Sequence, residues 1–194
     1  MTHKTLNITL LGPPGAGKGT QSEKIKNKYN LIHISTGDIF RKEINKQSEI
    51  GIKAKSFIDK GLLVPDEIVF DIIEITINDI KHEQGIIFDG FPRNYNQAIT
   101  LDNLLQSKNR SISLAIFIDT PEEELIKRML IRASIAKRSD DTPEIIKHRI
   151  ITYKNQTEPI LNYYLKQNKL HSIKGIGKIE DIFNSICKII DNYK

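Results

Sequence analysis

The stretch Gly12-Pro13-Pro14-Gly15-Ala16-Gly17-Lys18-Gly19-Thr20 decides how the rest of the chain is interpreted. It follows the apolar run Leu6–Leu11 and precedes a pattern with helical spacing, Gln21, Ile25 and Tyr29. A glycine-rich loop that ends in lysine between a strand and a helix is the context of a P-loop. Its glycines let successive backbone N–H groups face a phosphate, and the following helix adds its positive end. This order of elements disfavours the alternative, an accidental glycine-rich turn.

The residue after the lysine bears on metal binding. In the common pattern a serine or threonine follows the lysine directly and binds Mg²⁺. Here Gly19 takes that place and Thr20 follows. We therefore expect Mg²⁺ to be held mainly by phosphate oxygens and water, with no direct protein ligand. The residues expected to hold the phosphates are Gly15, Ala16, Gly17, Lys18, Gly19 and Thr20.

Short apolar runs separated by helical patterns predict the fold class. The runs are Leu6–Leu11, Leu31–Ile34, Gly85–Phe88, Leu114–Ile118 and Leu170–Ile173. Such alternation predicts an α/β protein with a doubly wound, five-stranded parallel sheet and right-handed crossovers. The chain of 194 residues suits a single domain, residues 1–194.

Helix starts and two additional segments complete the predicted organisation. Thr120-Pro121-Glu122-Glu123 and Thr142-Pro143 are typical helix starts, with threonine as the cap. Another helix is expected to begin near Pro65-Asp66-Glu67. Residues 35–64 form a mostly helical insertion between the second and third strands. Ala133–Asp141 is predicted to be a polar loop between two helices.

The composition and the short apolar runs favour neither a nucleic-acid-binding protein nor a membrane protein. The net charge of +5 comes from lysines scattered among acidic residues, so it predicts an ordinary basic surface with a local phosphate-binding cluster. The single cysteine, Cys187, falls in an apolar-periodic stretch and is expected to be a buried thiol. No apolar run approaches a membrane span, and the run at the N-terminus leads straight into the glycine loop rather than a signal cleavage site. We expect a cytoplasmic protein.

Two further motifs follow the predicted second and third strands. One is Ser35-Thr36-Gly37-Asp38 with Arg41 close behind, and the other is Asp89-Gly90-Phe91-Pro92-Arg93. Ligands of open α/β sheets bind outside the carboxyl ends of the strands, where both motifs are expected. Together with the P-loop, the motifs resemble the adenylate kinase family of nucleoside monophosphate kinases, from the first strand to the last helix.

The resemblance implies that residues 35–64 bind AMP. Arg41 and Arg93 would pair with its phosphate, although either could be a solvent-facing charge, and Gln97 would bond the adenine edge. Asp89 would contact Mg²⁺ through water, or cap a turn. The residues that would bind AMP are Thr36, Arg41, Leu62, Leu63, Val64, Gly90, Phe91, Pro92, Arg93, Gln97, Arg138 and Arg149.

Four further arginines belong to the expected catalytic set. Arg128 and Arg132 are four residues apart and so share one helix face, and Arg138 and Arg149 follow. They could be surface charges paired with nearby acids, yet phosphoryl transfer requires cations around the moving group. The resemblance places Arg128 against the ATP base and the other three around the phosphoryl group. It matches Asp140 and Asp141 to lid acids, although Asp141 or Thr142 could cap the next helix.

The resemblance also implies a reaction and its partners. The terminal phosphoryl group of ATP would pass in line to AMP, giving two ADP, with Mg²⁺ and with Lys18, Arg93, Arg132, Arg138 and Arg149 as catalytic residues. Gly177 would border the ATP adenine, or be a turn glycine. A monomer that binds neither nucleic acid nor membrane is expected.

The expected lid, residues 132–142, is of the short form. Its loop, Ala133–Lys137, contains neither cysteine nor histidine, so no structural zinc is expected. It also lacks the glycines usual in short lids, which leaves lid flexibility open. Three rival functions remain to be tested: a pyrimidine monophosphate kinase, a non-catalytic P-loop protein, and an RNA-binding module. Thr36 and Gln97 favour adenine over pyrimidines, and the absence of an aromatic stacking platform disfavours RNA.

Overall fold

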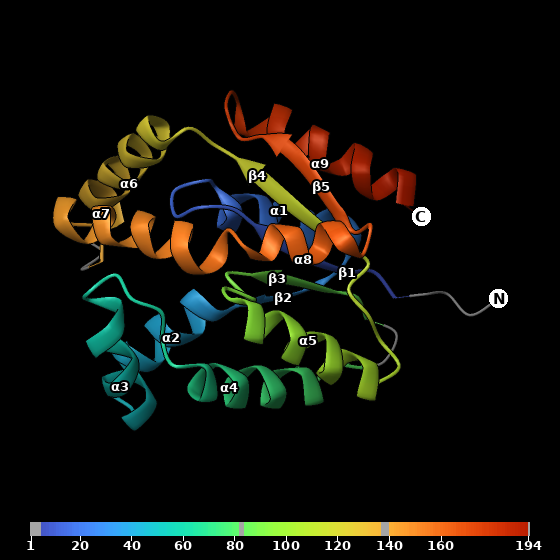
Figure 1. Cartoon of the computed structure of the whole chain (residues 1–194), viewed down its shortest axis with the longest axis horizontal. Helices are drawn as coiled ribbons and strands as arrows, with labels where there is room; N and C mark the ends of the chain where they lie inside the picture. The colour runs from blue at the N-terminus through green and yellow to red at the C-terminus, as the bar shows by residue number, and fades with distance from the viewer. Residues whose placement is uncertain (1–4, 82–83, 137–139, 194) are drawn as a thin grey trace.

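A computed structural model describes residues 5–81, 84–136 and 140–193. Five parallel strands form one sheet in the order β2-β3-β1-β4-β5 (Figure 1). They are β1 (Asn7–Leu11), β2 (Ile32–Ser35), β3 (Ile86–Asp89), β4 (Leu114–Asp119) and β5 (Leu170–Lys174). The predicted doubly wound parallel sheet is confirmed, and each strand boundary lies within one residue of its prediction.

Helices flank the sheet on both faces. They are α1 (Lys18–Tyr29), α2 (Thr36–Asn45), α3 (Glu49–Ile58), α4 (Asp66–Asn78), α5 (Tyr95–Ser107), α6 (Glu122–Ala136), α7 (Pro143–Thr152), α8 (Ile160–Lys166) and α9 (Ile179–Tyr193). A π-helical segment, η1 (Tyr153–Thr157), joins α7 to α8 and was not predicted. Within the described ranges, no helix combines the length and apolar character needed to cross a membrane.

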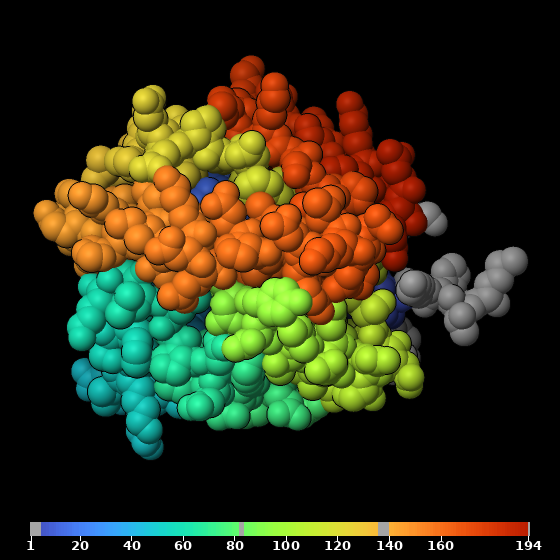
Figure 2. Space-filling view, viewed as in Figure 1, coloured from blue at the N-terminus to red at the C-terminus, as the bar shows by residue number. Residues whose placement is uncertain are grey.

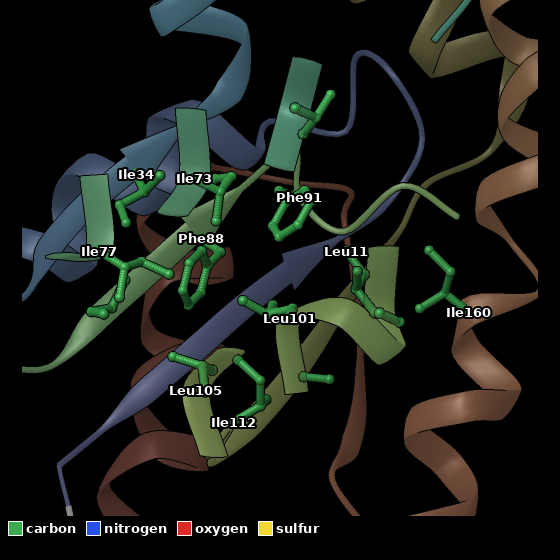
Figure 3. Close-up of a cluster of buried hydrophobic side chains, with 14 of the residues drawn as sticks. Leu11, Ile34, Ile73, Ile77, Phe88, Phe91, Leu101, Leu105, Ile112 and Ile160 are labelled. Atoms are coloured by element: carbon green, nitrogen blue, oxygen red, sulfur yellow. The ribbon is translucent and has the colours of Figure 1, made fainter. Parts of the chain in front are cut away.

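Alternation along the strands produces two hydrophobic cores. In β3, Phe88 faces the side covered by α4, α5 and α8, whereas Ile87 faces the side covered by α1 and α9. Successive side chains of a strand point to opposite faces, so a strand buried on both faces is apolar throughout. Figure 3 shows the first of these cores, where Phe88, Ile73 of α4 and Leu101 of α5 lie close together.

The sheet register brings the three sequence motifs to one edge. Asp89 at the end of β3 is paired with Leu10 of β1 on one side and with Ser35 of β2 on the other. The segments that follow these three strands therefore begin at the same level. This is the edge where parallel α/β sheets bind ligands.

Two predictions about α6 are wrong. The helix does not stop before Ala133 but continues to Ala136, because Ala133-Ser134-Ile135-Ala136 contains no glycine or proline and alanine favours helix. Residues 133–136 of the predicted polar loop are therefore helical. Thr120 does not cap the helix, because its side chain is buried and its hydroxyl has no hydrogen-bond partner among the residues that the structure describes. The predicted cap at Thr142 is confirmed: its Oγ1 accepts a hydrogen bond from the backbone N–H of Ile145, at 3.3 Å.

The end of the insertion packs directly on α7. Gly61 has φ +70°, and a Cβ there would lie only 3.0 Å from the carbonyl oxygen of Ile145. Thr152 at the end of α7 donates a buried hydrogen bond to the Gly61 carbonyl, at 3.1 Å. Figure 2 shows the same meeting of surfaces, where α7 lies against the segment between α3 and α4. The end of the segment 35–64 and α7 therefore lie directly against each other.

The core predicts how neighbouring positions of α4 respond to truncation. Ile73 is 1% exposed and Ile75, on the same helix, is 65% exposed. We expect Ile73→Ala to lower the free energy of unfolding by about 2–5 kcal/mol, because it leaves a cavity. Ile75→Ala should change it by less than about 0.5 kcal/mol. Urea denaturation of both variants is the measurement, and equal losses would contradict the assignment of the buried face.

Candidate active site

The P-loop forms the first wall of the site. Gly15 has φ +87°, and a Cβ there would lie 2.8 Å from the carbonyl oxygen of Leu125 in α6. Any larger residue would be strained and would collide with this helix. Lys18, the first residue of α1, donates from Nζ to the carbonyl oxygens of Gly12 and Pro13, at 2.7 and 2.9 Å. The loop thus curls around the ammonium group.

The end of β2 leads into a second wall. Ser35 caps α2 by accepting a hydrogen bond from the backbone N–H of Asp38, at 3.2 Å. Thr36 donates from its hydroxyl to the carbonyl oxygen of Gly90, at 2.8 Å. This bond joins the start of α2 to the turn after β3. Arg41, one helical turn further on, forms an ion pair with Asp38.

The turn after β3 is held from several sides. Thr9 of β1 donates a buried hydrogen bond to the Phe91 carbonyl oxygen, at 3.0 Å. Arg93 donates from Nε to the Gly90 carbonyl oxygen, at 2.6 Å. Thr157 of η1 donates to the Arg93 carbonyl oxygen, at 2.7 Å. The guanidinium group of Arg93 is therefore positioned by its own backbone turn and by the unpredicted π-helical segment.

A first cavity opens between this turn and residues 35–64. Apolar residues such as Phe40 and Val69 line one part of it, and polar and charged residues such as Lys18 and Thr152 line another. Of the residues predicted to bind AMP, those that line it are Thr36, Arg41, Leu62, Leu63, Val64, Gly90, Pro92, Arg93, Gln97 and Arg149. Phe91 is 1% exposed and packs in the core instead. The apolar part of such a cavity suits the base and sugar of a nucleotide, and the arginines suit its phosphate.

Gln97 has two partners that its sequence motif did not suggest. Its Oε1 accepts a hydrogen bond from the backbone N–H of Arg93, and its Nε2 donates to Asp66 Oδ1, both at 2.7 Å. Asn94 also donates to Asp66 Oδ1, at 2.8 Å. Asp66 starts α4, which lies 31 positions away in sequence, so no local pattern could reveal the contact.

A second cavity lies over the P-loop. Predicted residues that line it are Gly15, Gly17, Lys18, Gly19, Thr20, Asp89, Arg128 and Arg132. Ala16, although part of the P-loop, is buried and does not line this cavity. Gly177, which follows β5 and has φ +108°, does not line it either. His33 and Glu23 also line the cavity, and sequence reasoning missed them. His33 Nε2 lies 3.7 Å from Asp89 Oδ2, although its spacing in sequence gave no sign of this.

The two cavities share a cationic wall. Lys18, Arg41, Arg93 and Arg149 line both. These residues come from the P-loop, from α2, from the turn after β3 and from α7. Ligands in the two cavities would therefore meet at a common set of positive charges.

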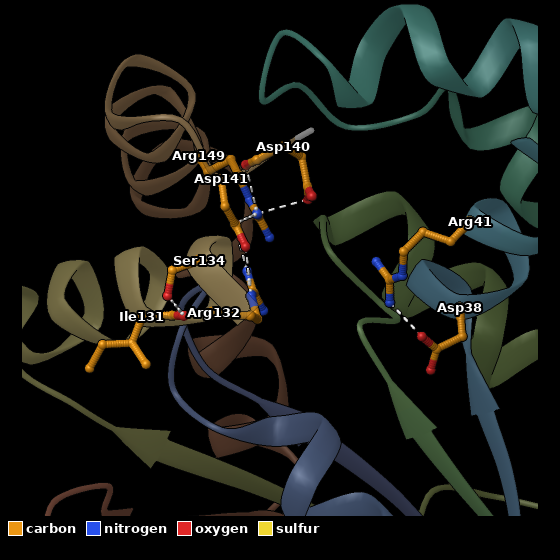
Figure 4. A network of polar contacts seen from close by, with 8 residues as sticks. All are labelled: Asp38, Arg41, Ile131, Arg132, Ser134, Asp140, Asp141 and Arg149. Atoms are coloured by element: carbon orange, nitrogen blue, oxygen red, sulfur yellow. Dashed lines mark hydrogen bonds and ion pairs between the residues drawn. The ribbon is translucent and has the colours of Figure 1, made fainter. Parts of the chain in front are cut away.

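A pair of aspartates holds the arginines of α6 and α7 in place (Figure 4). Arg132 donates from Nε and from a terminal nitrogen to the two carboxylate oxygens of Asp141, each at 2.7 Å. Arg149 donates to Asp141 at 2.7 Å and to the Asp140 carboxylate at 2.8 Å. Asp141 thus bridges two arginines and does not cap α7. Arg138 lies outside the described residues.

Burial and mutual repulsion lower the pKa values of Lys18, Arg93 and Arg149. The pKa of Lys18 is lowered to about 8; burial is the largest cause, nearby arginines add to it, and Asp89 opposes it. Burial also lowers the pKa of Arg93 to about 10, with Arg149 as the next cause. The pKa of Arg149 is lowered by burial against the opposing effect of Asp140 and Asp141. A cluster with these properties favours a ligand that carries several negative charges.

The residues present suit a magnesium ion that arrives with a nucleotide. Asp89 is 9% exposed and lines the cavity over the P-loop, and a Cβ at Gly19 would lie 3.5 Å from its carboxylate. Thr20 adds a hydroxyl. Across the described residues there is no group of three or more His, Cys, Asp or Glu that could hold a metal alone. One carboxylate and one hydroxyl fit an ion that keeps its waters and phosphate ligands.

Comparison with known proteins agrees with this geometry. A family model described as adenylate kinase matches residues 10–169. The adenylate kinase of Bacteroides fragilis is 46% identical over 186 residues, which cover 96% of this chain and 98% of the relative. The adenylate kinases of Parabacteroides distasonis and Clostridium perfringens are 45% and 38% identical, with 97% of this chain and the whole relative covered in each case. With a P-loop, two adjoining cavities and a shared wall of cations on a parallel sheet, this chain belongs to the adenylate kinase family.

Proposed function

We propose that this protein transfers the terminal phosphoryl group of ATP to AMP, giving two ADP. The proposal rests on the wall of Lys18, Arg41, Arg93 and Arg149 that separates the two cavities. ATP would place its phosphates in the cavity over the P-loop, with its base beside Arg128. AMP would occupy the cavity beneath the insertion. The two phosphate tails would then meet at the cations.

The reaction needs no covalent intermediate with the protein. An oxygen of the AMP phosphate attacks the terminal phosphorus of ATP, and the bond from that phosphorus to the bridging oxygen breaks. The electron pair stays on the departing ADP. No strong base is required, because a phosphate monoester is largely ionised near neutral pH. Catalysis then depends on positioning and on stabilisation of charge.

Each cation has a place in this scheme. Lys18 would contact the β- and γ-phosphates, and Arg41 and Arg93 would bind the AMP phosphate. Arg132 and Arg149 would exchange their bonds to Asp140 and Asp141 for bonds to phosphoryl oxygens. Arg138 would join them. Magnesium bound with ATP supplies further charge neutralisation, and Asp89 would hold its waters.

The surroundings of the reaction are part of the proposal. Residues 35–64 would form an AMP-binding segment and residues 132–142 a short lid. Closure of both would exclude water, which would otherwise compete with AMP for the phosphoryl group. We propose a cytoplasmic monomer that acts on ATP, AMP and ADP and binds no nucleic acid.

The direct test is a coupled assay for ADP formed from ATP and an acceptor, with Mg²⁺ present. We expect AMP to be the preferred acceptor over UMP and CMP. Preference for UMP or CMP would indicate a pyrimidine nucleotide kinase. Nucleotide binding without ADP formation would indicate a non-catalytic protein.

Removing Arg93 tests the shared wall. We expect Arg93→Ala to lower kcat/KM by about a hundredfold or more, because the charge acts on the phosphates as they react. Lys24→Ala, which removes a partly exposed cation paired with Glu180 outside both cavities, is the matched control and should keep normal activity. Circular dichroism should show both variants folded. An active Arg93→Ala enzyme would disprove the assigned role.

The pKa of Lys18 predicts how ATP binding depends on pH. Bound phosphates favour the ammonium form, so binding raises a pKa that stands at about 8 in the free protein. Above this pH, binding must take up a proton, and affinity should fall as pH rises from 8 to 9, which stays below the pKa of about 10 of Arg93. In Lys18→Arg, affinity should be weaker but nearly flat over this range, because arginine keeps its proton to higher pH than lysine. Calorimetry in buffers of different ionisation enthalpy measures the proton uptake, and identical pH profiles would refute this origin.

A further inference from the structure

Gln97 is held between two partners that each accept only one orientation of its amide. A backbone N–H can only donate, so the Arg93 N–H requires the oxygen of Gln97. An ionised carboxylate can only accept, so Asp66 requires the NH₂ group. A rotation of the amide by 180° would place donor against donor and acceptor against acceptor. The orientation of Gln97 is therefore determined at both ends.

Asp66 is itself oriented by the same network. Asn94 caps α5 by accepting a hydrogen bond from the backbone N–H of Gln97, at 2.8 Å. Its amide oxygen is thereby engaged, which leaves its Nδ2 to donate to Asp66 Oδ1. The same carboxylate oxygen thus receives Gln97 and Asn94. Gln97 is 1% exposed, so the loss of either partner would leave a buried polar group unpaired.

The amide of Gln97 still has bonding capacity toward the cavity that it lines. An amide nitrogen carries two hydrogens and an amide oxygen has two lone pairs. Among the described residues, the bonds to Asp66 and Arg93 leave one of each for a ligand. The side chain therefore offers a donor and an acceptor in a fixed order.

We propose that Asp66 is a specificity-determining positioning residue, which selects a 6-aminopurine over a 6-oxopurine by fixing the amide of Gln97. This inference rests on the proposed function, in which AMP occupies the cavity beside Gln97. The adenine edge has an amino donor at C6 and an acceptor at N1, which complement the fixed amide. Hypoxanthine and guanine reverse both groups, with an oxygen at C6 and a hydrogen on N1. With the amide unable to turn, a 6-oxopurine leaves two buried groups unpaired.

The test compares AMP with IMP, which differ only at this edge, as phosphoryl acceptors from ATP. The wild-type enzyme should prefer AMP by at least about a hundredfold in kcat/KM. Asp66→Ala should narrow this preference about tenfold, mainly by raising KM for AMP, while KM for ATP stays within about twofold. Asp66→Asn retains an acceptor oxygen and should restore most of the preference.

Glu67→Ala is the matched control. Glu67 is exposed and, like Asp66, lies in the first turn of α4, where acids favour the helix. This variant should keep the wild-type preference. If Asp66→Ala fails to fold, Asp66→Ser keeps a residue suited to a helix start but is too short to reach Gln97. It should narrow the preference to the same degree.

The outcomes separate the two proposals. A wild-type enzyme that does not phosphorylate AMP overturns the proposed function. A wild-type enzyme that uses IMP as well as AMP overturns the fixed amide. If Asp66→Ala or Asp66→Ser lowers activity with both acceptors equally, Asp66 is structural only and the inference fails.

Discussion

The burial of several cations close together is the constraint on which the whole site depends. Lys18, Arg93 and Arg149 come from three separate segments of the chain, and burial lowers the pKa of each. Like charges in a poorly hydrated space are unfavourable unless opposite charges accompany them. Here Asp89, Asp140 and Asp141 provide part of that compensation, and phosphates would provide the rest. The sheet, the turns and the helix starts serve to bring these charges together without letting them relax into solvent.

Backbone carbonyl groups hold the cations in addition to acidic side chains. Lys18 donates to two carbonyl oxygens of its own loop, and Arg93 donates to the Gly90 carbonyl. The Gly90 carbonyl also receives Thr36, so one oxygen joins two motifs that are distant in sequence. Because such contacts exist before any ligand binds, little reorganisation remains for the moment of reaction. The same principle applies to Gln97, whose orientation is set before a base arrives.

The fold could be predicted closely because strand periodicity, glycines and helix starts are local signals. The strands were placed within one residue, and the cap at Thr142 was identified correctly. Local signals also misled. Thr120 stands before a proline and two glutamates, yet tertiary packing buries its hydroxyl away from the helix. The stretch Ala133–Asp141 suggested a polar loop, although its first four residues, two of which are alanine, extend α6 by another turn.

The residues of the site likewise differ in whether local sequence could predict them. Residues within a motif, such as Lys18 and Arg93, could be selected because the chemistry of phosphates requires their types at those places. Residues that complete the site from elsewhere could not. Asp66 reaches the site from the start of α4, and His33 reaches it through the register of β2 and β3. Thr157 reaches it from a π-helical turn. None of these contacts has a fixed spacing in sequence, so only the three-dimensional structure shows them.

The unbroken course of α6 also limits how this protein can change in length. Its first turns touch the P-loop at Gly15 through Leu125 and Met129, and Arg132 lies further along the same helix, over the cavity. One residue inserted or deleted between Met129 and Arg132 would turn the arginine by about 100° about the helix axis. The guanidinium would then leave the cavity while the contact with the P-loop remained. The spacing between Met129 and Arg132 within α6 is therefore fixed by the position that the guanidinium must take over the cavity.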